Sequence, residues 1–223
     1  MKTVIIVPVF NEELRVVDTI KTILKNSKNK IIIIDDGSTD NSFKILKKEF
    51  NREKRVLIIN HAINLGKGAA MKTGAEMAWK LGAEAIVFID ADGQHDPKFI
   101  KAFEDTLKKS QVVFGYRELG NNVPWVRRYG NFVAKKLIGV LFNVKRKDLL
   151  CGFFGFRKSV YEKICWTSSR YAVETEIATK VGKLKIPYSE IKIDTIYLDK
   201  YKGVSLIDAI KVLIKIPYWY FRK

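Results

Sequence analysis

The chain of 223 residues lacks several features of secreted and membrane-spanning proteins. It has only two cysteines, Cys151 and Cys165, and their positions form no metal-binding pattern. Met1 and Lys2 lead straight into an apolar segment without a secretory cleavage site. No apolar run approaches the roughly 20 residues that a membrane-spanning helix needs. These absences predict a cytoplasmic protein with reduced thiols.

Acidic residues are also scarce relative to basic ones. The chain has 41 Lys and Arg against 24 Asp and Glu, which gives a net charge of +17. Residues 1–110 have 19 basic and 15 acidic side chains, whereas residues 111–223 have 22 and 9. The second half therefore carries most of the positive field. Its expected partners are a phosphorylated substrate, an anionic membrane surface or a nucleic acid.

Repeats, low-complexity segments and linkers are absent too, so residues 1–223 are expected to form a single domain. In the first half, apolar runs alternate with segments of helical periodicity, which predicts an α/β fold with a parallel sheet buried on both faces. The apolar runs lie within residues 3–10, 30–40, 55–60, 84–90 and 111–117. The helical segments lie at 12–25 and 41–50, after a glycine turn at 64–70 that opens a helix to about Leu81, and from Pro97 onward. In the second half, helices are expected at 124–143, 171–182 and 204–220, and β-like segments at 153–158 and 186–198.

Acids and glycines of the first half gather just after the predicted strands, where open parallel sheets bind their ligands. The stretch VFIDADGQHDP places Asp90, Asp92 and Gln94 directly after the fourth apolar run. Such oxygen ligands suit Mg²⁺ or Mn²⁺ and leave coordination positions for substrate phosphates. The alternative is an ordinary acidic turn before a helix that begins at Pro97. The neighbouring His95 is expected to face solvent.

The other strand ends suggest a nucleotide platform. Asp35 and Asp36 can accept hydrogen bonds from a base or a ribose, although Gly37 and Asp40 also suit a plain turn and helix cap. The segment NLGKGAA resembles a phosphate loop but does not have the Walker A pattern. The segment PVFNEE is compatible with nucleotide binding or with a helix start that has acids in its first turn.

Charged residues of the second half have less specific patterns. Helical glutamates such as Glu174 and Glu176 are usually solvated, and the basic run 145–147 is typical of a solvated loop. Several scattered cations would together suit a substrate with more than one phosphate. These are Arg117, Arg128, Lys200 and Lys202.

Eight segments come in the order found in family-2 glycosyltransferases of the GT-A fold, and the chain resembles the dolichyl- or polyprenyl-phosphate sugar synthases in particular. The segments are VPVFNEE, IDDGSTDNS, NLGKGAA, DADGQHDP, GYR, DLLCGFFGFRK, ETE and KYKGVS. The resemblance covers nearly the whole chain. It implies a GT-A-type open, mainly parallel sheet with flanking helices. Residues 1–117 would form a Rossmann-like nucleotide-sugar and metal-binding half, and residues 118–223 an acceptor-binding half with an amphipathic C-terminal helix.

The resemblance also implies roles for individual residues. Asp90, Asp92 and Gln94 would hold Mg²⁺ or Mn²⁺ on the diphosphate of a UDP- or GDP-sugar, and Lys200 stands where the family usually has Arg. The expected catalytic residues are Asp92, Arg117, Arg128 and Glu176, with the two arginines facing the acceptor phosphate. The expected contacts of the nucleotide-sugar are Pro8, Phe10, Asn11, Glu12, Asp35, Asp36, Lys67, Asp90, Ala91, Lys200 and Lys202.

The predicted activity is that of an inverting, metal-dependent hexosyltransferase that moves a hexose or N-acetylhexosamine to a dolichyl or polyprenyl phosphate. A lipid phosphate, with its second pKa of about 6, is already ionised at neutral pH and needs no general base. The alternative acceptor is a sugar hydroxyl in glycan or cell-surface polysaccharide synthesis, and Glu174 or Glu176 would then take the proton.

A basic nucleic-acid-binding domain is a third hypothesis. It is disfavoured because the sequence has no recognised binding motif and because the acids at the strand ends would repel phosphates in the absence of a metal. The amphipathic segments 124–143 and 204–220 instead predict peripheral association with the cytoplasmic face of an anionic membrane.

Overall fold

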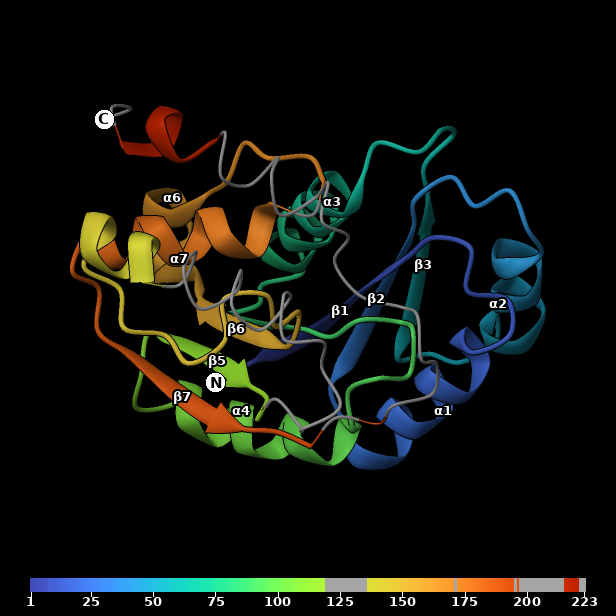
Figure 1. Ribbon diagram of the computed structural model, residues 1–223. Coiled ribbons are helices and arrows are strands. Elements are labelled where there is room, and N and C mark those ends of the chain that lie inside the picture. Colours follow the sequence, from blue (N-terminus) through green and yellow to red (C-terminus); the bar gives the residue numbers. More distant parts are fainter. Residues whose placement is uncertain (119–135, 171, 195, 197–214, 221–223) are drawn as a thin grey trace.

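A computed structural model describes residues 1–118, 136–170, 172–194, 196 and 215–220 (Figure 1). These residues form one seven-stranded sheet with helices on both faces. Three expected site residues lie outside the described part of the chain, as do most of the two helices expected at 124–143 and 204–220. The site residues in question are Arg128, Lys200 and Lys202.

The sheet has the strand order β3-β2-β1-β4-β6-β5-β7. Strands β1 to β4 run parallel to one another, β6 runs antiparallel to both of its neighbours, and β7 is parallel to β5. The prediction of an open, mainly parallel sheet is therefore confirmed. The insertion of β6 between β4 and β5 was not expected. The strands are β1 (Thr3–Val9), β2 (Lys30–Asp35), β3 (Val56–Asn60), β4 (Ala85–Phe88), β5 (Val112–Tyr116), β6 (Phe154–Arg157) and β7 (Tyr188–Lys192).

Helices cover the sheet in two layers (Figure 1). One face carries α1 (Val16–Asn26), α2 (Ser42–Phe50) and α4 (Ile100–Leu107), which the short 3₁₀ helix η1 (Pro97–Phe99) precedes. The other face carries α3 (Lys67–Lys80), α6 (Lys158–Ile164) and α7 (Val173–Lys183). Among the described residues, α6 is the helix that the sequence pattern did not indicate. Residues 136–142 and 215–220 are also helical.

The strands are apolar without interruption because both faces of the sheet are buried. In β1, Val4 and Ile6 pack in the cluster that includes α3, whereas Ile5 and Val7 pack in the cluster that includes α1. All four side chains are completely buried. Polar side chains are consequently displaced to the strand ends, which positions the candidate site at the carboxyl edge of the parallel strands.

Candidate active site

The chain after β1 and the loop after β2 fix each other at this edge. Asn11 has a positive φ of 54°, and its backbone N–H donates to Ser38 Oγ at 3.0 Å. The Glu12 N–H donates to Ser42 Oγ at 2.8 Å. These bonds hold the segment in place while the ring of Phe10 stays 42% exposed. An exposed aromatic ring on a fixed backbone is suited to stacking against a nucleoside base.

Two other residues that were expected to contact the nucleotide-sugar belong to the packed edge of the sheet. Pro8 lies within β1 and pairs with Ile34 of β2. Ala91 is buried after β4, and its carbonyl accepts a hydrogen bond from Thr19 Oγ1 at 3.1 Å.

Asp36 is buried and anchors the loop between β3 and α3. Its Oδ1 accepts a hydrogen bond from the Leu65 N–H (3.0 Å) and lies 2.8 Å from His61 Nδ1, and its Oδ2 accepts from the Gly66 N–H (2.7 Å). His61 Nε2 lies 3.0 Å from Thr73 Oγ1 on α3. The sequence suggested Asp36 only as a base or ribose contact. The structure also gives it the role of fixing this loop.

Asp35 is the last residue of β2 and is completely buried. Its Oδ2 accepts hydrogen bonds from the Ser38 N–H (3.1 Å) and, with the Asn60 amide turned toward it, from the amide nitrogen (2.9 Å). Its Oδ1 has no hydrogen-bond partner among the residues that the structure describes. An unsatisfied buried acceptor is costly, and a ligand N–H or O–H group could reach this oxygen only if the packing around it changed.

Lys67 joins the two halves of the chain through an ion triad in which Glu174 is buried and Lys67 and Asp90 are partly exposed. It begins α3 after Gly66, whose φ is 94°. Its Nζ lies 2.6 Å from Asp90 Oδ1, after β4, and 2.6 Å from Glu174 Oε1, on α7. Burial opposes the charge on Lys67, but Asp90 and Glu174 outweigh burial and raise the pKa of Lys67 above its usual range. The expectation that Glu174 is a solvated surface glutamate is wrong, because its side chain is buried in this triad.

Asp90 is enclosed on its other side as well. Its Oδ2 lies 3.6 Å from His95 Nε2, and a Cβ added to Gly152 would meet this same oxygen at 2.1 Å. Burial disfavours the charged carboxylate, but Lys67 and His95 outweigh burial and hold the pKa of Asp90 well below its usual range. The expectation that His95 faces solvent is wrong. His95 is buried, and it lies against Phe153 with 5.7 Å between the ring centroids.

Asp92 and Gln94 continue the same turn. Asp92 Oδ1 accepts the Gln94 N–H at 3.0 Å, and both side chains are partly exposed. Within the described ranges, no three His, Cys, Asp or Glu side chains are arranged to hold a metal ion. The expected metal ligands are instead the two carboxylates of Asp90 and Asp92 and the amide oxygen of Gln94. These are hard oxygen donors of the kind that Mg²⁺ and Mn²⁺ accept, and so few ligands leave positions for phosphate oxygens. The residue types present therefore fit such an ion.

Arg117 lies just after β5 and is held by a carboxylate that the sequence did not single out. Its Nε donates to Asp148 Oδ2 at 2.7 Å and its Nη2 donates to Asp148 Oδ1 at 3.3 Å. Burial works against both charges, yet the pair raises the pKa of Arg117 and lowers the pKa of Asp148. This two-point ion pair orients the guanidinium, which is also close enough to Asp90 for the two charges to interact.

The basic run 145–147 is the solvated loop that the sequence suggested only at its two lysines. Lys145 and Lys147 are exposed, but Arg146 is buried with its guanidinium carbon 3.7 Å from the centroid of the Phe114 ring. Its Nη2 donates to the Gly115 carbonyl at 3.3 Å. Burial lowers the pKa of Arg146. This side chain belongs to the support of β5 rather than to the exposed surface.

Glu176 was expected to be catalytic, but its carboxylate is bound on both oxygens by neighbouring groups of the protein. Oε1 accepts from the Thr167 N–H (2.9 Å) and lies 3.1 Å from Lys180 Nζ, and Oε2 accepts from the Ser168 N–H (2.8 Å). The residue is buried in α7. Burial disfavours its charge, but these partners outweigh burial and lower its pKa. A carboxylate stabilised in this way is a poor general base, so the geometry does not support that role.

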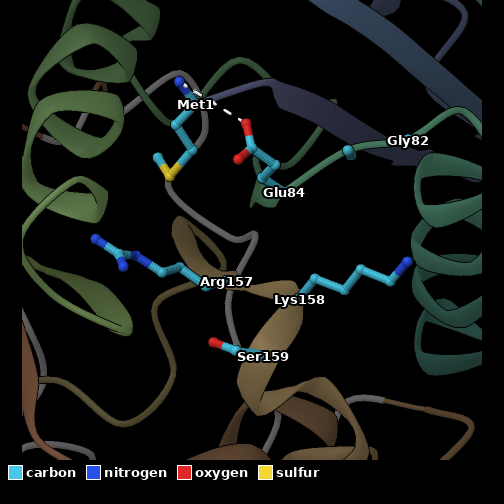
Figure 2. A pocket seen from close by; sticks show the side chains of 7 residues that line it. Met1, Gly82, Glu84, Arg157, Lys158 and Ser159 are labelled. Atoms are coloured by element: carbon cyan, nitrogen blue, oxygen red, sulfur yellow. Dashed lines mark ion pairs between the residues drawn. The ribbon is translucent and has the colours of Figure 1, made fainter.

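A small cavity borders this edge of the sheet. It has a volume of about 170 Å³ and is lined by Asn11–Arg15 and Asp40. A larger cavity, of about 430 Å³, is lined by Met1, Gly82–Glu84 and Arg157–Ser159, at the opposite edge of the sheet, where β1 and β4 begin. Figure 2 shows its cations diverging, with Arg157 and Lys158 pointing in opposite directions. It is therefore not part of the candidate site.

Comparison with known proteins identifies the family. Residues 4–165 match the family model of glycosyl transferase family 2. The chain belongs to this family. It is 29% identical over 234 residues to the UDP-N-acetylglucosamine–dolichyl-phosphate N-acetylglucosaminyltransferase of Methanococcus voltae, across 95% of this chain and 93% of that protein. It is also 29% identical over 168 residues to the dodecaprenyl-phosphate galacturonate synthase of Rhizobium johnstonii, across 72% of this chain and 49% of that protein.

Solved structures show that this glycosyltransferase has the GT-A fold. Glucosyl-3-phosphoglycerate synthase from Mycobacterium tuberculosis, in complex with Mn²⁺, UDP and phosphoglyceric acid, superposes with a TM-score of 0.77. The match covers 100% of this chain and 79% of that one, at 15% sequence identity. In the part of the glycosyltransferase that the structure describes, none of the helices combines the length and apolarity needed to cross a membrane.

Proposed function

We propose that this glycosyltransferase moves a hexose or N-acetylhexosamine from a nucleotide-diphospho-sugar to a dolichyl or polyprenyl phosphate, with inversion at the anomeric carbon. The observation that carries the proposal is the meeting of opposite charges at the end of β4. The Asp90 and Asp92 carboxylates suit a cation, while Lys67 and Arg117 approach the same place from α3 and β5. Two relatives named for transfer to polyprenyl-type phosphates support the choice of acceptor.

In the proposed reaction, an acceptor phosphate oxygen forms a bond to the anomeric carbon as the bond to the nucleoside diphosphate breaks. The electron pair of that bond leaves with the diphosphate. A Mg²⁺ or Mn²⁺ ion held by Asp90, Asp92 and Gln94 would neutralise this growing charge. Lys67 adds a fixed cation on the donor side. Arg117, oriented by Asp148, offers a cation toward the acceptor half, residues 118–223.

The state of the glutamates favours a phosphate acceptor over a sugar hydroxyl. A hydroxyl nucleophile needs a carboxylate that is free to take its proton. Glu176 is occupied by backbone N–H groups and Lys180, and Glu174 is paired with Lys67. A lipid phosphate is ionised at neutral pH, because its second pKa is about 6. It therefore needs no carboxylate to remove a proton.

The direct test is transfer itself. The protein is incubated with a panel of UDP- and GDP-sugars and a polyprenyl phosphate, with Mg²⁺ or Mn²⁺, and the lipid fraction is analysed for a sugar-phosphate lipid. Formation of that lipid, lost in chelator and restored by the ion, supports the proposal. Transfer only to a free sugar hydroxyl would replace the lipid phosphate by the alternative acceptor.

Glu176→Gln is expected to keep kcat within about tenfold of the wild type, below the 10²-fold or greater loss that is usual for a removed general base. It is also expected to lower the free energy of unfolding by about 1–3 kcal/mol, because an amide cannot accept all the hydrogen bonds of the carboxylate. The pKa of Glu176 is depressed in the folded protein, so this stabilisation is present at neutral pH. It should shrink as pH falls through the folded-state pKa.

Urea denaturation at pH 7 and at lower pH measures the free energy of unfolding of the variant, and a transfer assay measures its kcat. Glu162→Gln on the exposed side of α6 is the matched control and should change neither quantity. A loss of kcat by about 10²-fold or more with an intact fold would contradict the structural role of Glu176 and favour a hydroxyl acceptor.

An exposed apolar surface supports the proposed membrane association. Leu137, Val140 and Leu141 are exposed on the helical residues 136–142. The helical residues 215–220 lie against this segment, since the Tyr220 and Phe142 rings are 6.1 Å apart between centroids. Together with the positive charge of residues 111–223, this surface suits the interface of an anionic bilayer, where apolar side chains insert and basic ones face lipid headgroups.

Flotation with anionic liposomes is expected at low salt and much less at high salt, because salt screens surface charge. Val140→Asp should reduce flotation, since it puts a charge on a side chain that is 80% exposed in this apolar surface. Leu14→Asp is the matched control, because Leu14 is 86% exposed but belongs to the first half of the chain. Absence of wild-type flotation at low salt would remove the support for a membrane-bound acceptor.

A further inference from the structure

Lys67 occupies a carboxylate that the proposed metal ion would also use. Its Nζ is 2.6 Å from Asp90 Oδ1, and the other oxygen of Asp90 is confined by His95 and by the backbone at Gly152. Glu174 holds Lys67 from the opposite side, also at 2.6 Å. A cation that binds Asp90 must therefore share it with an ammonium group that is already in place.

The backbone around Lys67 is fixed, so the lysine is not simply displaced with its loop. The Gly68 N–H donates to the Ser169 carbonyl at 2.7 Å, and Trp166 Nε1 donates to the Gly68 carbonyl at 2.7 Å. A Cβ on Gly68 would meet the Ser168 carbonyl oxygen at 2.0 Å, which shows how closely the two segments approach. The first turn of α3 is thus clamped on the segment that precedes α7.

We propose that Lys67 makes metal binding depend on the nucleotide. This inference rests on the proposed function. Without nucleotide, Lys67 partly neutralises the charges of Asp90 and Glu174. A divalent ion on its own is therefore bound weakly. A nucleoside diphosphate brings its own negative charge, which both the ion and Lys67 can attract. The ion and the nucleotide then bind together, and Lys67 acts as a positioning residue that prevents tight binding of the ion alone.

Lys67→Met is therefore expected to change the affinities for Mn²⁺ alone and for the nucleotide in opposite directions. Removing the ammonium group releases Asp90, so the variant is expected to bind Mn²⁺ alone about tenfold more tightly than the wild type, within the range of ordinary coupling between sites. It should also bind the nucleotide more weakly, because one cation is lost. The factor by which nucleotide increases Mn²⁺ affinity should consequently fall. Removal of a lysine that only stabilised the fold would not increase the affinity for Mn²⁺.

Mn²⁺ affinity is measured by electron paramagnetic resonance of free Mn²⁺, with and without UDP or GDP. Lys72→Met is the matched control, because Lys72 is exposed on the same helix, and it should behave as the wild type. Lys67→Arg keeps the charge and should retain weak binding of Mn²⁺ alone. Circular dichroism and thermal unfolding establish that each variant is folded.

Lys67→Met leaves the buried Glu174 carboxylate without its partner, which is strongly destabilising. If this variant does not fold, the double variant Lys67→Met/Glu174→Gln removes both charges and carries the same expectation. Equal or weaker binding of Mn²⁺ alone in the folded variant overturns the inference about Lys67. Failure of the wild type to bind Mn²⁺ together with either nucleotide would instead overturn the proposed function.

Discussion

Asp92→Asn is expected to reduce sugar transfer by about 10³-fold while leaving the fold intact. A metal ion at a leaving diphosphate contributes several kcal/mol to the transition state, and each 1.36 kcal/mol corresponds to a factor of ten in rate. Asn lacks the negative charge that holds the ion. It keeps an Oδ1, so the hydrogen bond from the Gln94 N–H, 3.0 Å long in the wild type, can still form.

The measurement is kcat/KM for lipid-linked product over a series of Mn²⁺ concentrations, together with thermal unfolding. Asp105→Asn is the control, because Asp105 is an exposed carboxylate on α4 paired with Lys101 and Lys108. It should leave transfer unchanged. Near-normal turnover of Asp92→Asn at ordinary metal concentration, with the same unfolding midpoint, would show that Asp92 is not a metal ligand.

The fold could be predicted from the sequence where one physical rule dominates. A run such as Ile31–Ile34, which alternates along the chain with segments of helical period, favours a sheet that helices cover on both faces, and this is what the structure shows. The prediction that functional residues follow the strands depends on the same geometry. Asp35, Asp36 and Asp90 do lie at the carboxyl edge of the parallel strands.

The pairings across the two halves could not be predicted. From the sequence, Glu174 and Glu176 resemble ordinary solvated glutamates of a helix. Their neighbouring residues do not indicate that the first turn of α7 packs against α3 and the segment 165–170. Their burial becomes visible only when Lys67 and the backbone N–H groups of Thr167 and Ser168 are brought to them by the fold. The long-range partner, rather than the local pattern, decides whether a charged side chain is solvated.

The surroundings of Asp90 follow the same rule. His95 was expected to face solvent. In the structure it turns inward beside Phe153, which comes from the segment before β6. That segment also brings Gly152 to Asp90. The position of β6 between β4 and β5 creates both contacts, and the first-half pattern contains no signal for this antiparallel insertion.

Gly152→Ala tests the most restrictive of these contacts. Gly152 has no positive φ, so alanine can adopt its backbone conformation without strain. The added Cβ, however, would stand 2.1 Å from Asp90 Oδ2 and 2.7 Å from its Cγ. The carboxylate cannot move away without lengthening its 2.6 Å ion pair with Lys67. The substitution should therefore displace a proposed metal ligand without changing any charge.

The expected result is a loss of about 10²-fold in kcat/KM, since a displacement of about 1 Å in a reacting assembly can have an effect of this size. Mn²⁺ affinity in the presence of nucleotide should fall in parallel, because the misplaced oxygen is a ligand of the ion. Gly139→Ala is the matched control. The nearest atom that its Cβ would meet is the Val144 carbonyl oxygen, at 3.1 Å, rather than an atom of Asp90, and it should retain wild-type transfer. If folded Gly152→Ala keeps both transfer and Mn²⁺ affinity, the position of Asp90 beside Gly152 is not required for activity, and its assignment as a metal ligand fails.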